Sequence, residues 1–80
     1  MYIVYIIYSL TTSKYYTGQT INLEDRIRRH NSGLSKSTKS GIKWELKYKI
    51  ELISRSEAML LEIFIKKRGA KRYLEDLNSY

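Results

Sequence analysis

The chain has 80 residues, no cysteine, a single histidine and a formal charge of +7. A chain of this length predicts one domain over residues 1–80, which buries only about 60% of the surface that the unfolded chain exposes. The absence of cysteine excludes disulfides, zinc ribbons and thiol catalysis, and one histidine excludes a multi-histidine metal site, so a metal would need carboxylates. The basic balance favours nucleic acid as a partner, although many small proteins share it.

Residues 2–8 are β-branched and aromatic throughout, with no polar face. This composition predicts a strand covered on both sides, in the centre of a sheet. Val4 and Ile6 would line one face, and Tyr5 the other, where a core aromatic is its simplest interpretation. The segment lacks a basic n-region and a cleavage site and is too short to span a membrane, so we expect a cytoplasmic protein without a membrane partner.

A short polar segment, residues 9–13, joins this strand to a second one over residues 14–18, as in an antiparallel hairpin. Tyr5 and Tyr16 share a face of the sheet only if the residue numbers of opposed pairs sum to an odd value. The sequence leaves this parity open.

A helix is predicted from about Leu23 to Asn31. Asn22 is a natural N-cap, acidic residues fill the first turn, and Gly33 follows the last turn. At about 100° per residue, Arg26 and His30 lie along one edge of the apolar stripe of this helix. Both side chains should therefore project at the boundary between core and solvent.

Four further cations are candidates for phosphate contacts. Arg28 and Arg29 point away from the apolar stripe, and Lys36 and Lys39 lie in the Ser/Gly/Lys-rich segment 32–41, which we expect to be a mobile loop without an apolar anchor. A solvated lysine loop with no ligand is an equally good interpretation of this segment.

Residues 43–52 alternate strictly between apolar and charged side chains. The period of two predicts a strand with one buried and one solvent-exposed face.

A capping box at Ser54 and Glu57 predicts that a helix starts at about Arg55 and ends before Gly69. Residues 70–77 are predicted to form a second short amphipathic helix. The order β-β-α-β-α-α predicts an α+β fold with a small three-stranded antiparallel sheet flanked by helices.

Glu62 is the one acidic residue among six apolar neighbours in the first of these two helices. Its simplest interpretation is an exposed ion pair with Lys66 at i, i+4, which contributes about 0.3–0.5 kcal/mol.

Taken in this order, the residues resemble the GIY-YIG nuclease domain, in particular the small stand-alone bacterial type that is similar to the N-terminal nuclease domain of the excision-repair endonuclease subunit. Ile3-Val4-Tyr5 stands where the family has Gly-Ile-Tyr, and Tyr16-Thr17-Gly18 where it has Tyr-Ile-Gly. Arg26 and His30 fall at the helix positions of the family, and Glu62 at its metal-binding glutamate. The chain departs from the pattern at Ile3 and Thr17, which are both strand positions.

The resemblance implies an endonuclease that hydrolyses phosphodiester bonds, of DNA rather than RNA, in a role such as DNA repair. It implies that Glu62 holds one Mg²⁺ or Mn²⁺ ion and that Arg26 grips the scissile phosphate. Tyr5 would orient or deprotonate the attacking water, with Tyr16 and His30 around it. A phenolate at neutral pH would require its pKa to fall by about 2–3 units, through Arg26 and the metal.

The competing hypotheses are a basic module that binds nucleic acid without cutting it and a basic protein docked to a ribonucleoprotein. A lone carboxylate at position 62 favours the enzyme, since a binding module has no need of it. A chain of this size buries only about 600–1,000 Å² on DNA, so we expect it to recognise DNA shape, to form a homodimer or to rely on a partner protein.

Overall fold

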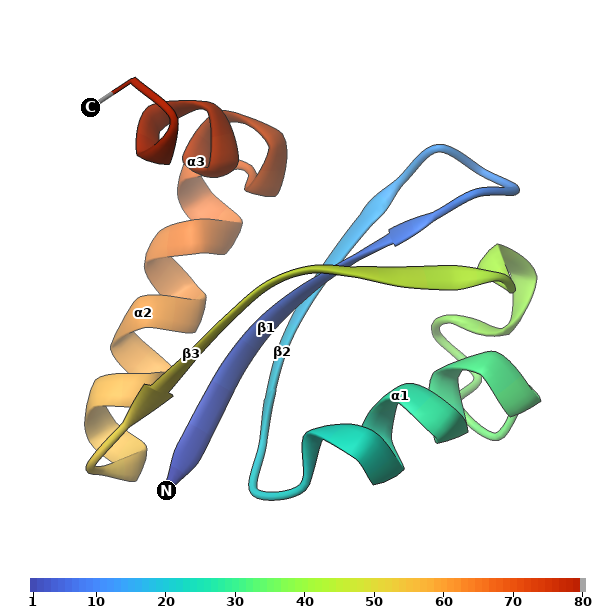
Figure 1. The fold of residues 1–80 in the computed structure, drawn as a ribbon, viewed down its shortest axis with the longest axis horizontal. Coiled ribbons are helices and arrows are strands. Elements are labelled where there is room, and N and C mark those ends of the chain that lie inside the picture. The colour runs from blue at the N-terminus through green and yellow to red at the C-terminus, as the bar shows by residue number, and fades with distance from the viewer. Residues whose placement is uncertain (80) are drawn as a thin grey trace.

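The chain folds into a three-stranded antiparallel sheet of order β2-β1-β3 with helices on both faces (Figure 1). The computed structural model describes residues 1–79. The predicted α+β class and the order of the elements are confirmed. The elements are β1 (Tyr2–Ser9), β2 (Tyr15–Thr20), α1 (Leu23–Ser32), the 3₁₀ turn η1 (Lys39–Gly41), β3 (Trp44–Leu52), α2 (Arg55–Arg68) and α3 (Ala70–Leu77).

Strand β1 is the central strand, and residues 4–7 are almost completely buried. Because successive side chains of a strand point to opposite faces, Val4 and Ile6 pack in the cluster beneath α2 and α3, whereas Tyr5 and Ile7 pack beneath α1. The prediction of a central strand covered on both sides is confirmed. One face of the sheet therefore holds the aliphatic core, and the other holds the aromatic cluster of Tyr5.

The register of the hairpin decides which tyrosines meet. In every pair between β1 and β2 the two residue numbers sum to an odd value, as for Ile7 opposite Tyr16 and Tyr5 opposite Gly18. Tyr5 and Tyr16 consequently lie on the same face, which the sequence could not decide. Strand β2 also ends two residues later than predicted, at Thr20.

Strand β3 differs from its prediction. Its register against β1 shifts between Ile6 and Ile7, so that Tyr48 opposes Ile6 but Leu46 opposes Ile7. A bulge of this kind inserts one residue and reverses the alternation of faces. The prediction of one buried and one wet face was therefore wrong: the apolar side chains are divided between both faces of the sheet, and Trp44 is the one fully buried residue of the strand.

Side-chain caps set the helix starts as predicted. Asn22 Oδ1 accepts a hydrogen bond from the backbone N–H of Asp25 at 3.1 Å, and Ser54 Oγ accepts one from Glu57 at 3.1 Å. Helix α1 ends at Ser32, one residue later than predicted, and Gly33 follows it in the left-handed conformation with φ of 82°. Among residues 1–79, every helix is too short or too polar to cross a bilayer.

The segment between α1 and β3 is held by polar contacts. Thr38 is only 1% exposed, and its carbonyl oxygen accepts a hydrogen bond from the Trp44 indole at 2.8 Å. The hydroxyl of Ser9 donates to the carbonyl of Gly41 at 2.7 Å. We expected a mobile loop without an apolar anchor. The structure adds what the sequence did not indicate, that hydrogen bonds of hydroxyl, indole and carbonyl groups anchor this part of the segment.

The close approach of Gly18 to Tyr5 yields a stability prediction. A Cβ at position 18 would lie 2.6 Å from the Tyr5 hydroxyl oxygen. We expect Gly18→Ala to lower the free energy of unfolding by about 1–3 kcal/mol, as for other overpacked cores, in urea denaturation. In a Tyr5→Phe background the cost should shrink, because the clashing oxygen is gone. An equal cost in both backgrounds would contradict this explanation.

Candidate active site

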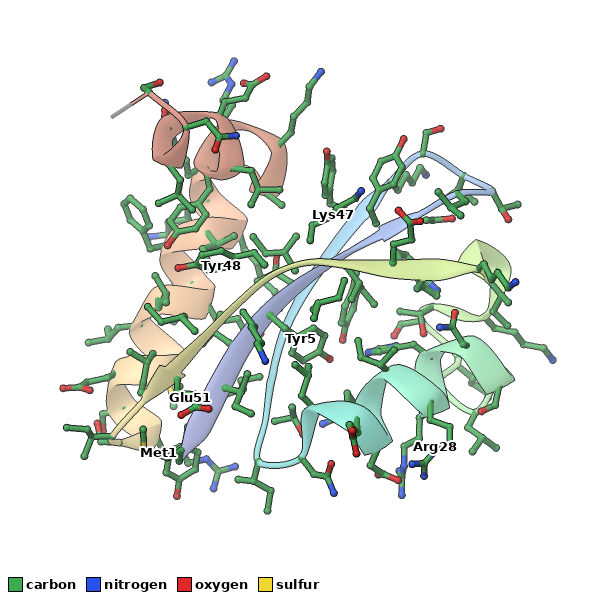
Figure 2. All side chains as sticks on the ribbon, viewed as in Figure 1. Met1, Tyr5, Arg28, Lys47, Tyr48 and Glu51 are labelled. Carbon is green, nitrogen blue, oxygen red and sulfur yellow. The ribbon has the colours of Figure 1, made fainter. Side chains whose placement is uncertain are left out.

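Three of the predicted site residues form one cluster between the sheet and α1. Tyr5 points from β1 toward α1, whereas Arg28 lies on the outer side of that helix (Figure 2). The ring centroids of Tyr5 and Tyr16 are 6.4 Å apart, and the His30 ring lies 5.8 Å from Tyr5 and 5.1 Å from Tyr16. The hairpin register and the face of α1 that carries His30 together bring these rings into contact.

A chain of hydrogen bonds runs through this cluster. The Tyr5 hydroxyl lies 2.9 Å from His30 Nε2, and His30 Nδ1 lies 2.7 Å from the Thr38 hydroxyl oxygen. The Thr38 hydroxyl in turn donates to the carbonyl of Ser35 at 3.4 Å. A carbonyl can only accept, so we assign the proton of the neutral imidazole to Nδ1, which donates to Thr38. His30 Nε2 then carries a lone pair directed at the Tyr5 hydroxyl.

The electrostatics of the cluster keep both partners of this bond neutral. Burial raises the pKa of Tyr5 well above that of a free phenol, and the nearby Tyr16 raises it further, against the opposing effect of Arg26. Burial, followed by the charge of Arg26, lowers the pKa of His30. The residues of the chain thus move the pKa of Tyr5 in the direction opposite to the one that a resting phenolate base would require.

Glu62 lies on α2, at the edge of the sheet formed by β2. One of its carboxylate oxygens pairs with Lys66 Nζ at 2.7 Å, and the other accepts a hydrogen bond from Gln19 Nε2 at 3.1 Å. The i, i+4 pair is present, but the Glu62 side chain is only 18% exposed, and its charge raises the pKa of Tyr5. Glu62 is therefore neither in open solvent nor in direct hydrogen-bond contact with the aromatic cluster.

A metal ion at Glu62 would depend on ligands from outside the chain. Residues 1–79 contain no group of three or more His, Cys, Asp or Glu side chains that could hold a metal. A single carboxylate suits Mg²⁺, which is commonly bound by one or two carboxylates while water and phosphate oxygens fill the other positions. Because Lys66 already neutralises Glu62, an incoming cation would have to displace its ammonium group.

The predicted phosphate-binding cations lie on the surface. Arg28 and Arg29 both pair with Asp25, at 3.4 Å and 3.1 Å, and are largely exposed. Lys36 and Lys39 are exposed in the segment that Thr38 anchors. None of these four residues is part of the aromatic cluster as described in residues 1–79.

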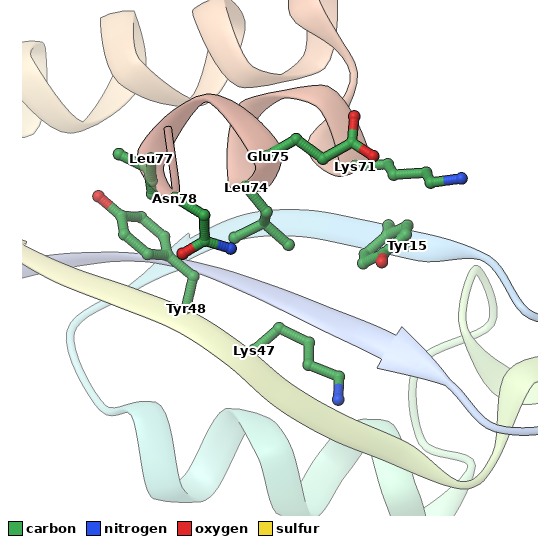
Figure 3. Close-up of a pocket in the computed structure, with 8 residues that line it drawn as sticks. All are labelled: Tyr15, Lys47, Tyr48, Lys71, Leu74, Glu75, Leu77 and Asn78. Atoms are coloured by element: carbon green, nitrogen blue, oxygen red, sulfur yellow. The ribbon is translucent and has the colours of Figure 1, made fainter. Parts of the chain in front are cut away.

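Two cavities flank the sheet. One, of about 450 Å³, lies between α3 and the sheet, on the face opposite Tyr5 (Figure 3). Its Lys47 pairs with Glu45 at 3.1 Å, and Glu75 also lines it, so its charge is mixed. The other, of about 510 Å³, is lined by Gln19, which donates to Glu62, and by Arg26, whose charge lowers the pKa of Tyr5 and of His30.

Sequence reasoning missed Thr38 and Gln19. Thr38 stands in a Ser/Gly/Lys-rich segment, where no local pattern distinguishes a buried hydroxyl from an exposed one. Gln19 had one usable signal, because alternation along β2 places it on the face opposite Tyr16, toward α2.

The hydrogen-bond chain predicts how His30 titrates. We expect the imidazole to stay neutral at pH 7, to carry its proton on Nδ1 and to titrate below the usual value of about 6.5. Because the pKa of His30 is lower in the folded than in the unfolded state, the unfolded state binds more protons as the pH falls below about 6.5. The free energy of unfolding should therefore decrease in that range. Imidazole ¹⁵N chemical shifts across a pH series measure the tautomer and the pKa together.

Thr38→Val is the control, since it keeps the side-chain shape and removes the hydroxyl. The proton should move toward Nε2 in this variant, and Thr38→Ser should restore it to Nδ1. An Nε2 proton in the parent protein, or an unchanged tautomer in Thr38→Val, would overturn the assignment.

Comparison with known proteins gives a match at the level of the family. The family model of the GIY-YIG catalytic domain matches residues 1–75. No curated protein and no solved structure matches the chain at a significant level. The family match covers both strands of the tyrosine hairpin, α1 with His30, and α2 with Glu62. The chain therefore belongs to the GIY-YIG family of nuclease domains.

Proposed function

We propose that this protein is a metal-dependent endonuclease that hydrolyses the phosphodiester bonds of DNA. Its catalytic residues would be Tyr5, Tyr16, Arg26, His30 and Glu62. The observation that carries the proposal is the buried 2.9 Å hydrogen bond between the Tyr5 hydroxyl and His30. The lone pair of His30 Nε2 is directed at the Tyr5 hydroxyl, so the imidazole is positioned to take up the proton of Tyr5.

In the proposed step, a water oxygen attacks phosphorus and the bond to the leaving oxygen breaks. The water proton passes to the Tyr5 oxygen while the Tyr5 proton passes to His30 Nε2. Tyr5 is then a phenol both before and after the transfer, which is compatible with its raised pKa. His30 becomes an imidazolium, whose charge the anionic phosphate stabilises. The leaving oxygen departs with the electron pair of the broken P–O bond and takes up a proton from solvent water.

Arg26 would bind the scissile phosphate. It lines the cavity of about 510 Å³, and its charge affects the pKa of both Tyr5 and His30. A guanidinium can hold two phosphate oxygens at once, which fixes the phosphorus relative to the attacking water. A Lys at this position would supply the charge without the planar fork.

Glu62 would hold the Mg²⁺ or Mn²⁺ ion, which when bound supplies positive charge for the oxygens that become negative during cleavage. Gln19 keeps the carboxylate oriented, and Lys66 neutralises it before the ion arrives.

Glu62→Gln tests this role. The substitution keeps the size of the side chain and removes its charge, so cleavage should fall by at least about 10²-fold, while affinity for DNA without divalent ions should hold or rise slightly. Broadening of the Gln19 amide signals by Mn²⁺ should also disappear. Lys66→Met is the matched variant: Mn²⁺ should broaden these signals at lower concentration, since no ammonium group competes for Glu62.

If Glu62 is only the partner of Lys66, Glu62→Gln should cost at most about 0.5 kcal/mol of stability and leave cleavage and Mn²⁺ broadening unchanged. That result would count decisively against the site.

The alternative function is a basic module that binds nucleic acid without cleaving it. The Glu62–Lys66 ion pair, which forms without any metal, is compatible with it. The discriminating assay incubates the purified protein and Mg²⁺ or Mn²⁺ with single-stranded, duplex and branched DNA and with RNA. Binding without cleavage of any of these substrates would support the alternative.

A further inference from the structure

The cavity beside Arg26 contains a second arginine that no sequence motif singles out. Arg55 lines this cavity together with Tyr2, Gln19, Thr20, Ile21 and Arg26. The first turns of α1 and α2 both lie at the end of the sheet where β1 begins (Figure 1), which explains how residues so distant in the chain share one cavity. No carboxylate belongs to the lining residues.

The charge of this cavity is not neutralised by the protein. Among the described residues, neither Arg26 nor Arg55 takes part in a salt bridge, whereas Arg28, Arg29 and Arg68 each pair with an aspartate. Two arginines thus line one space of about 510 Å³ without a salt-bridge partner among residues 1–79. Such a space favours an anion with several oxygens.

The position of Arg55 also argues for a ligand. It is the first residue of α2, where the positive end of the helix dipole favours acidic side chains and disfavours cations. A cation there works against helix stability and has no carboxylate partner within residues 1–79 to offset this. Arg55 is therefore better explained by an anion that it binds than by the stability of α2.

The cavity is lined by one residue related to each part of the candidate active site. Gln19 both lines it and donates to Glu62, while Arg26 both lines it and affects the pKa of Tyr5 and His30. A nucleic acid strand with one phosphate at Arg26 would carry its neighbouring phosphate along the same cavity. Arg55 lines the same cavity from another helix, α2.

We propose that Arg55 binds a backbone phosphate adjacent to the one at Arg26, so that the cavity is a two-phosphate site for a polynucleotide strand. The proposal rests on the proposed function for its class of ligand, but it does not require cleavage. It assigns to Arg55 a role in binding and positioning the strand.

The experiment compares Arg55→Gln with Arg72→Gln, a matched loss of one exposed arginine on α3, outside this cavity. Binding of fluorescent single-stranded and duplex oligonucleotides is measured by anisotropy across a salt series, without divalent ions. Arg55→Gln should weaken binding about tenfold, as expected for a lost charge-assisted hydrogen bond, and reduce the slope of log affinity against log salt by about 0.7–0.9. Arg72→Gln should change affinity by less than about twofold.

The thermal midpoint of Arg55→Gln should be unchanged or slightly higher, since the cation at the helix start is removed. Equal losses of affinity in both variants would show a general charge effect and overturn the proposal, as would an unchanged salt slope in Arg55→Gln.

Inorganic phosphate separates the two sources of the anion. The side-chain NMR signals of Gln19 and Arg55 are followed in two titrations, one with inorganic phosphate and one with an oligonucleotide of equal phosphate content. If phosphate saturates these signals at concentrations where the oligonucleotide does not shift them, the cavity binds a free anion and the proposal fails. If no substrate is ever cleaved but Arg55→Gln still loses affinity selectively, the nuclease proposal fails while the phosphate site stands.

Discussion

Because β1 is covered on both faces, Tyr5 is only 1% exposed, and its hydroxyl needs a hydrogen-bond partner inside the protein. A buried hydroxyl left without a partner costs about 1–3 kcal/mol, a large part of the stability of so small a chain. His30 supplies the partner, and Thr38 in turn satisfies the second nitrogen of the imidazole. Within residues 1–79, no buried side-chain nitrogen or oxygen lacks a hydrogen-bond partner.

This requirement extends from the aromatic cluster to the connection that precedes β3. The carbonyl of Thr38 accepts from the Trp44 indole, and the Asn31 amide accepts from the backbone N–H of Trp44 at 2.7 Å and donates to its carbonyl at 3.2 Å. The end of α1 and the start of β3 are thereby fixed to each other. A hydroxyl that looks like part of a solvated loop holds the imidazole in the orientation that proton transfer from Tyr5 would use.

The two hypotheses for Glu62 are compatible with one structure. A carboxylate that is 18% exposed needs compensation for its lost hydration, and Lys66 and Gln19 provide it. A divalent ion would compensate the same charge, with Lys66 released toward solvent, where it is already 55% exposed. Without a metal, the ion pair with Lys66 compensates the charge of Glu62. Its presence therefore does not distinguish a nuclease from a binding module.

The sequence by itself determined the features that depend on neighbouring residues: the caps at Asn22 and Ser54, the central strand and the order of the elements. Arg26 and His30 could be placed on one side of α1, because helical spacing is local. The tertiary structure alone decided the rest. The hairpin register put Tyr16 beside Tyr5, and the bulge in β3 divided its apolar side chains between two faces. Thr38 reached His30, and Arg55 joined the cavity of Arg26, through contacts between segments distant in the chain. Such contacts depend on pairing and packing across the whole fold, which no local pattern of residue types encodes.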